Sequence, residues 1–119
     1  MNLLPGKITG TGAQTTVALD NGGTAVTSIA TTDADMGKKV NVGVRPEDFE
    51  PTNSTYIFKD TVDIVEALGE VTLAYFEREG ADHIIAKLQG IHHELRGKDL
   101  ALTADPSKVH MFHDGQSMR

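Results

Sequence analysis

Hydrophobic and polar residues alternate in short runs along most of this chain, which is typical of β-strands that bury one face. In the segment "KKVNVGV", residues 38–44, the side chains of Val40, Val42 and Val44 fall on the same side of an extended chain. The residues between them are polar, charged or glycine. The segment therefore predicts a strand with one buried face.

A tight hairpin is predicted between residues 15–19 and residues 24–27. The sequence Asp20-Asn21-Gly22-Gly23 separates these two apolar runs. Asn-Gly is a strong signal for a two-residue turn, because both residues tolerate positive φ. A short helical turn is also expected in residues 32–39, capped by Thr32 or Asp33.

Residues 61–79 admit a helical and an extended interpretation. Apolar residues at helical spacing form a partial stripe, but Gly69 interrupts it and the β-branched residues on both sides favour strand–turn–strand. The extended interpretation places Val62, Ile64 and Glu66 on one face, and Asp63, Val65 and Ala67 on the other. After Gly69, it sets Val71, Leu73 and Tyr75 against Thr72, Ala74 and Phe76.

Three more apolar runs, at 83–90, 98–105 and 107–113, complete a set of seven to ten predicted strands. Short strands at a spacing of 8 to 12 residues are typical of all-β sandwiches and small barrels. The long gap at residues 45–57 is expected to be a crossover between sheets. A chain of 119 residues suits a single domain, so we expect one β-domain over residues 1–119.

Composition excludes several function classes. The chain has no cysteine, which rules out disulfides, thiolate metal sites and cysteine nucleophiles. The formal net charge of −6 lies entirely in residues 44–119. An acidic surface with few aromatic residues argues against nucleic acid as a partner.

No apolar run approaches the roughly 20 residues that a membrane-spanning helix needs. Pro5 and Gly6 stand where a secretion signal would have an apolar core, so we expect no such signal. We therefore expect a soluble domain.

Motifs for catalysis and metal binding are also missing from the sequence. Neither Gly6-Lys7 nor Gly37-Lys38 continues into a phosphate-binding loop of the Gly-Lys-Ser/Thr type. The carboxylate pairs Glu47/Asp48 and Glu77/Glu79 lack a context that would position them around a cleft. The sequence contains no nucleophile-elbow serine. We expect a protein that is not an enzyme.

The five histidines lack metal-ligand spacing. His92 and His93 are neighbours and point to opposite faces of a strand, whereas His110 and His113 have a spacing that suits a helix. We expect histidines in surface or half-buried positions and no bound metal. We expect His110 and Phe112 to serve the core and the closure of the barrel rather than a ligand site.

The segment "VNVGVRPEDFEP", residues 40–51, ends a strand with an arginine, a proline and two carboxylates. Pro46 fixes its own φ and disfavours the α region for Arg45, which predicts an extended corner. Glu47 and Asp48 then begin a helical turn, where negative charge is favourable. Two interpretations stay open here: a rigid strand exit with a local ion pair of Arg45, and a contact point for a second chain.

Four segments in order resemble one family. "GVRPEDF" resembles the Gly-[Ile/Val]-Arg-Pro-Glu signature in the C-terminal domain of ATP-binding subunits of bacterial ABC-type sugar importers. "VDIVEALGEVTLAYFE" is similar to the family's hairpin, and "GKDLALTADPSKVHMFH" followed by "DGQSM" is similar to its closing motif. "MNLLPGKI" resembles the segment that enters this domain. The resemblance covers nearly the whole chain.

The resemblance implies a regulatory domain built on OB-fold-like small barrels of short antiparallel strands, of the TOBE or MOP-like type. In that family two copies contact each other and support the ATPase dimer. The ATPase motifs are absent here, so the resemblance implies that the chain is excised from a longer one with an N-terminal ATPase domain. This chain itself would hold no cofactor, and ATP and Mg²⁺ would bind the missing domain.

The resemblance also implies partners and a location. The partners would be a second copy of the chain, the ATPase domain, the permease subunits indirectly, and a regulatory protein. The location would be cytoplasmic, peripheral on the inner face of the bacterial plasma membrane. Its contact candidates are Gly43, Arg45, Pro46 and Glu47 of the corner and Glu66, Gly69 and Glu70 of the hairpin.

Two of these candidates have a specific expected role. Arg45 is expected to pair with Glu66 or Glu70, within one chain or across a dimer. Gly69 is expected to provide positive φ in a hairpin turn.

Two other functions remain open. One is a small-oxyanion-binding module of the MOP type, with backbone amides and hydroxyls of residues 6–16 around a molybdate-like anion. The other is a scaffold domain with no ligand.

Overall fold

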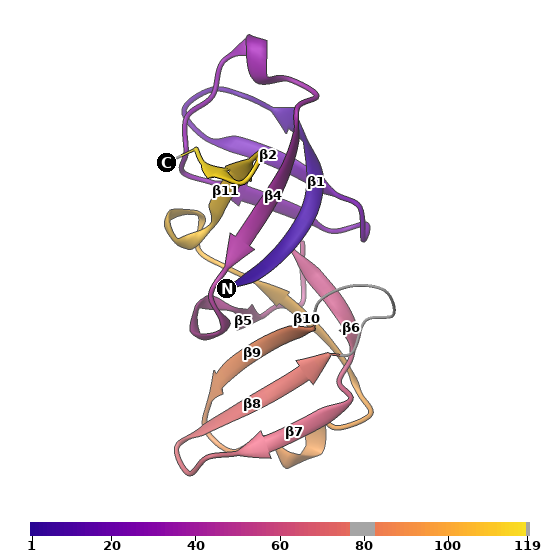
Figure 1. Cartoon of the computed structure of the whole chain (residues 1–119). Coiled ribbons are helices and arrows are strands. Elements are labelled where there is room, and N and C mark those ends of the chain that lie inside the picture. Colours follow the sequence, from indigo (N-terminus) through magenta and orange to yellow (C-terminus); the bar gives the residue numbers. More distant parts are fainter. Residues whose placement is uncertain (77–82, 119) are drawn as a thin grey trace.

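The computed structural model describes residues 1–76 and 83–118. Within these residues the long regular elements are all β-strands, and every strand pair is antiparallel. The molecule is elongated, with dimensions of 45 × 27 × 25 Å, and its two termini lie in the same half (Figure 1). The prediction of an all-β chain is confirmed.

A six-stranded sheet forms the first half. In spatial order its strands are β12 (Gln116–Ser117), β11 (His110–His113), β4 (Lys39–Val44), β1 (Asn2–Gly10), β2 (Thr15–Leu19) and β3 (Thr24–Thr27). The hairpin of β2 and β3 confirms the prediction from Asn-Gly, and Gly22 has a φ of +92°. Val40, Val42 and Val44 are buried, as the alternation in β4 predicts.

Two three-stranded sheets form the second half (Figure 1). One contains β5 (Glu50–Pro51), β10 (Asp99–Thr103) and β6 (Phe58–Thr61). The other contains β7 (Ile64–Ala67), β8 (Val71–Phe76) and β9 (Ile84–Gln89). Residues 45–57 carry the chain from the first half to the second, which confirms the predicted crossover.

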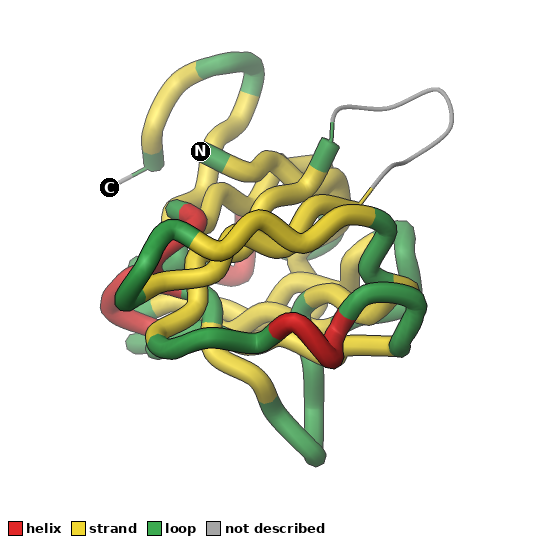
Figure 2. Tube along the Cα trace, turned by 90° about the horizontal axis from the view of Figure 1, so that it is seen from below, coloured by secondary structure: helices red, strands yellow, loops and turns green. Residues whose placement is uncertain are grey.

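Short 3₁₀ turns connect several strands. They are η1 (Asp33–Asp35), η2 (Pro46–Asp48), η3 (His93–Leu95) and η4 (Pro106–Lys108). An end-on view shows these turns between the strands that make up most of the trace (Figure 2). In the described part of the chain no helix has the length and apolar character needed to cross a bilayer.

One continuous core fills the space between the sheets of both halves. In the first half, Val42, Val44 and Met111 are completely buried. In the second half, the rings of Phe58 and Phe76 meet edge to face, with centroids 5.0 Å apart. This geometry is favourable for aromatic pairs, and it joins the two three-stranded sheets.

Side-chain hydrogen bonds fasten the halves to each other. The amide of Asn2 on β1 donates from Nδ2 to the carbonyl oxygen of Ile85 at 2.8 Å, and Asn2 Oδ1 accepts from Ile85 N at 2.9 Å. Within the first half, the hydroxyl of Thr27 on β3 donates to the carbonyl oxygen of Val109, the residue before β11, at 2.7 Å. Asn2 and Thr27 are both buried, so these bonds replace contacts that water would otherwise make.

The structure corrects the expectation for residues 61–67. Val62 is 1% exposed, whereas Ile64 is 49% exposed, so the two side chains do not share a face. The reason is that β6 ends at Thr61 and β7 begins at Ile64 in a different sheet. Two connecting residues break the alternation that a single strand would have kept.

His110 and Phe112 lie on β11, which adds to the six-stranded sheet beside β4, but their side chains border the core and are not part of it. Both side chains are half-buried, and the core positions of this segment are Val109 and Met111, each 0% exposed. The number of strands was underestimated as well. The described residues contain twelve, including the two-residue strands β5 and β12.

A carboxylate caps the 3₁₀ turn η4. Asp105 accepts hydrogen bonds from the hydroxyl of Ser107 at 2.7 Å and from its backbone N–H at 2.9 Å. These bonds lower the pKa of the Asp105 carboxyl below its ordinary value of 3.8. A hydrogen bond from Lys38 likewise lowers the pKa of Asp35 at η1, and one from a backbone N–H lowers that of Glu94 in η3.

Asn2→Ala should destabilise the protein, because it leaves the partly buried N–H and C=O of Ile85 without their protein partner. We expect the free energy of unfolding to fall by about 1–3 kcal/mol. Chemical denaturation measures this change. Asn41→Ala, at an exposed position of β4, is the matched control and should change stability by less than about 0.5 kcal/mol. Equal losses in the two variants would show that the Asn2 bonds do not stabilise the fold.

Asp105→Ala should lower the melting temperature at neutral pH, because η4 loses its cap. A lowered carboxyl pKa means that the stabilisation is present above the ordinary value and is lost as pH falls through the folded value. The difference in melting temperature from the wild type should therefore shrink as pH falls below about 4. Asp105→Asn keeps an acceptor without the charge, so its loss should be smaller. A difference independent of pH would contradict this role.

Candidate functional site

The corner after β4 has the conformation that its sequence predicts. Arg45 is extended, with φ −71° and ψ 148°, and Pro46 occupies the first position of η2. The N–H of Asp48 donates to the carbonyl oxygen of Arg45 at 3.0 Å and closes the turn. The strand exit is therefore fixed by proline and by one backbone hydrogen bond.

The ion pair at the corner involves a different residue from the one expected. Asp48 lies 3.7 Å from the ammonium of Lys108 in η4, and Lys108 is 60% exposed. Such a partly solvated pair contributes at most about 1 kcal/mol. Arg45 and Glu47 are exposed, and Arg45 forms no ion pair within 4.0 Å with any residue that the structure describes. The Arg45 guanidinium is thus available to a group outside this chain.

Gly43 lies below an apolar patch on the outer face of the six-stranded sheet. Its cross-strand neighbours are Leu3 on β1 and His110 on β11. A side chain at this position would meet Met1 Sδ at 2.5 Å and Phe112 Cε2 at 2.8 Å. Met1 is 53% exposed and Leu3 is 43% exposed. Glycine lets these side chains lie flat over the strand.

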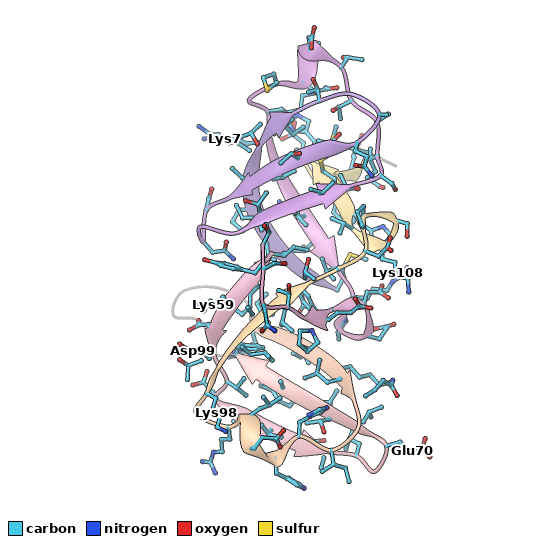
Figure 3. The ribbon with its side chains drawn as sticks, turned by 180° about the vertical axis from the view of Figure 1, so that it is seen from behind. Lys7, Lys59, Glu70, Lys98, Asp99 and Lys108 are labelled. Atoms are coloured by element: carbon cyan, nitrogen blue, oxygen red, sulfur yellow. The ribbon has the colours of Figure 1, made fainter. Side chains whose placement is uncertain are left out.

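The predicted hairpin connects β7 and β8. Gly69 has a φ of +84°, and the N–H of Leu68 donates to the carbonyl oxygen of Val71 at 2.8 Å, which confirms the expected turn. Glu70 projects from the tip of the hairpin (Figure 3). Glu66 is exposed on β7, directly opposite Leu73.

The structure does not bring the corner and the hairpin together within one chain. The turn η2 packs against β9, whereas Glu66 lies on β7 at the opposite edge of the same sheet. No hydrogen bond or ion pair joins Arg45 to Glu66 or Glu70 among the described residues. Pairing between two copies of the chain stays a prediction.

Sequence reasoning missed the outer face of the β7–β8–β9 sheet. Leu73 and Tyr75 on β8 are half-buried on this face, and Lys87 on β9 is exposed beside them. The alternation in β8 indicated two faces but not which one faces solvent. The pairing of Leu73 with both Glu66 and Lys87 follows from strand register, which the sequence alone does not reveal.

The described surface has two clefts, one of them beside the corner. A cleft of about 480 Å³ is bordered by Lys7 and Lys39, which are cross-strand neighbours, and by Asp20 and Asp114. A cleft of about 270 Å³ lies between η2 and β9, with Glu47 and Lys87 on its rim. Charged side chains of both signs border each cleft.

Catalytic and metal-binding groups do not cluster in the described residues. No group of three potential metal-ligating side chains is found there. Glu77 and Glu79 lie outside the described residues. In the segment considered for an oxyanion, the N–H groups of Ile8 and Gly12 donate to backbone carbonyls, and the hydroxyl of Thr15 donates to Ile29 O at 2.6 Å. These groups are already engaged in holding the sheet.

Gly43→Ala should be tolerated better than Gly6→Ala. A Cβ at Gly43 meets the flexible ends of Met1 and Phe112, whereas a Cβ at Gly6 would lie 2.6 Å from the backbone oxygen of Ala18. Overpacking against backbone costs about 1–3 kcal/mol, and movable side chains reduce that cost. Thermal unfolding of the two variants measures the difference. A larger loss for Gly43→Ala would show that the patch is rigid.

Known proteins match this chain along its whole length. Residues 1–49 match the MalK OB fold domain, and residues 42–112 match the TOBE domain. The cytoplasmic molybdate-binding protein ModG, solved with molybdate bound, has a similar structure. The TM-score is 0.68 at 14% identity, over 94% of this chain and 95% of that one. This likeness confirms the OB-type, MOP-like fold.

Curated relatives are longer proteins. The alpha-glucoside transport ATP-binding protein AglK of Rhizobium meliloti (strain 1021) is 45% identical over 122 residues, which span 100% of this chain and 34% of that protein. The lactose transport ATP-binding protein LacK of Rhizobium radiobacter is 33% identical over 127 residues, again 100% of this chain and 34% of that protein. The chain thus spans about a third of the length of these relatives.

The family matches agree with the geometry described above. The OB match covers β1 to β4 and the corner, and the TOBE match continues through both three-stranded sheets to β11. The resemblance stated from the sequence is therefore confirmed. This chain belongs to the TOBE domain family, and it is an OB/TOBE domain of the kind found in ATP-binding proteins of ABC-type sugar importers.

Proposed function

We propose that this domain is the non-catalytic regulatory and dimerisation domain of an ABC sugar importer's ATP-binding subunit, supporting the ATPase dimer during ATP-driven carbohydrate uptake. The observation that carries the proposal is the 45% identity to a transport ATP-binding protein over the whole chain. That relative is about three times as long, so the rest of the subunit would bind ATP and Mg²⁺. This domain would then act through contacts alone.

The exposed residues of the corner support such a role. Arg45 and Glu47 carry charge at a rigid strand exit, and Arg45 has no ion-pair partner among the described residues. Glu66 and Glu70 present further carboxylates on the hairpin. We infer that these groups meet a second copy, the ATPase portion of the subunit or a regulatory protein. The permease subunits would be affected indirectly, at the inner face of the membrane.

An oxyanion-binding module is the weaker alternative. The similar fold of ModG favours it, but at 14% identity only the fold is comparable. In this chain the amides of Ile8 and Gly12 and the hydroxyl of Thr15 already have protein partners. An anion would have to displace them. Calorimetric titration of the chain with molybdate and sulfate distinguishes the two functions, and tight binding would favour the module.

Truncation tests the proposed function most simply. An intact subunit should dimerise and hydrolyse ATP in the assembled importer, and a subunit without residues 1–119 should lose stable dimerisation in the absence of nucleotide. The isolated chain should show no ATP hydrolysis. Dimerisation is measured by light scattering and hydrolysis by phosphate release. A truncated subunit that dimerises and couples transport like the intact one would overturn the proposal.

Arg45→Ala in the intact subunit provides the matched point variant. Arg45 is exposed and forms no ion pair among the described residues. We therefore expect the free energy of unfolding of the variant to differ from that of the wild type by less than about 0.5 kcal/mol. Transport-coupled hydrolysis should nevertheless fall if the corner is a contact. Lys59→Ala, an exposed residue on β6 that projects from another side of the molecule, is the control (Figure 3).

A further inference from the structure

The outer face of the β7–β8–β9 sheet carries two opposite charges on either side of an apolar centre. Strand register places Glu66 on β7 directly opposite Leu73 on β8, and Lys87 on β9 directly opposite Leu73 from the other side. Leu73 is half-buried, and both charged side chains are exposed. Neither charge forms an ion pair within 4.0 Å in the described part of the chain.

Apolar residues extend this central row along the strands. One neighbouring row consists of Ile64, Tyr75 and Ile85. In the other, Val71 lies opposite the exposed Gln89 on β9, and its carbonyl oxygen accepts a hydrogen bond from the N–H of Leu68. Ile64 is 49% exposed and Leu68 is 51% exposed. The opposite face of the sheet contains the buried Thr72, Ala74 and Phe76, so the core uses that face, whereas Val71, Leu73 and Tyr75 on the outer face are only half-buried. At the β9 edge, Lys87 shares the rim of a cleft with Glu47 of η2.

We propose that two copies of this domain pack these outer faces together about a two-fold axis parallel to β8. This inference rests on the proposed function, in which two copies contact each other. Rotation about that axis exchanges the two edges of the sheet and keeps each row in place. Glu66 of one copy then faces Lys87 of the other, twice, and Leu73 faces its own equivalent on the axis. The contact is isologous and self-complementary.

Charge selects this axis over the other one that lies in the plane of the contact. A two-fold axis perpendicular to the strands would keep β7 over β7, and Glu66 would face Glu66 while Lys87 faced Lys87. Like charges directly opposite each other in a contact are destabilising. Both axes align the strands of the two packed sheets, which is the common arrangement in sandwiches, so charge alone distinguishes them.

The size of the face indicates a weak contact. Each sheet offers three rows on three strands, whereas a standard stable interface uses about 20–30 residues on each side. The isolated domain should therefore associate only at high concentration. In a longer subunit, any further contact raises the effective concentration of the two faces, so a weak pair of faces still sets their orientation.

Charge reversal tests the face and the axis together. Sedimentation equilibrium of the 119-residue chain up to millimolar concentration measures self-association. Glu66→Lys and Lys87→Glu should each weaken the dimer by about tenfold or more, since each replaces two attractive pairs by two repulsive ones. An equimolar mixture of the two variants should associate again, because in the mixed pair every contact joins opposite charges. The double variant should also associate with itself.

The controls use charges outside the rows. Asp20→Lys in the turn between β2 and β3 and Lys59→Glu on β6 change the net charge by the same amounts and should leave association within about twofold of wild type; Figure 3 shows Lys59. Circular dichroism checks that all variants are folded.

Three outcomes would overturn the inference. A wild-type chain that stays monomeric at millimolar concentration would show that the faces do not associate. A dimer unaffected by Glu66→Lys and Lys87→Glu would place the contact elsewhere. A mixture that fails to associate would rule out the parallel axis. The truncation experiment tests the proposed function separately. It measures whether the whole subunit dimerises, whichever surface of this domain forms the contact.

Discussion

The fold depends on a single hydrophobic core that all three sheets share, because each sheet is too small to be stable alone. A three-stranded sheet has little apolar area of its own, and it becomes stable only by packing against another layer. Here the chain leaves the first half after β4 and returns from β10 to β11, so both halves enclose the same buried cluster. The edge-to-face pair of Phe58 and Phe76 joins the two smaller sheets. The hydrogen bonds of Asn2 hold β1 to β9.

This sharing has a consequence for function. Two halves that share a core and buried hydrogen bonds are expected to move together, as one body about 45 Å long. The corner with Arg45 lies near the junction of the halves, and the hairpin tip with Glu70 lies at one end of the molecule (Figures 1 and 3). A rigid support can hold two attached domains at a set separation while those domains change conformation.

The sequence allowed local backbone conformation and burial to be predicted, but not which strands and which charged side chains pair with each other. The positive φ of Gly69, the extended Arg45 before Pro46 and the buried Val40, Val42 and Val44 all follow from residue type and near neighbours. Between Val62 and Ile64 the chain passes from one three-stranded sheet to the other. This depends on how distant segments pack, and no local sequence pattern indicates it. For the same reason Asp48, not Arg45, forms the ion pair, since Lys108 is sixty residues away in sequence. The candidate contact residues therefore needed strand register before they could be grouped into surfaces.

The mass of the natural gene product decides whether this domain belongs to a transport ATP-binding subunit. An antibody raised against this chain can detect that product in extracts of the source cells. We predict a species about three times the mass of this chain, in line with relatives of which the chain covers 34%. It should be recovered with the membrane fraction together with the permease subunits. A species of 12.8 kDa that is free of any transporter would rule out such a subunit.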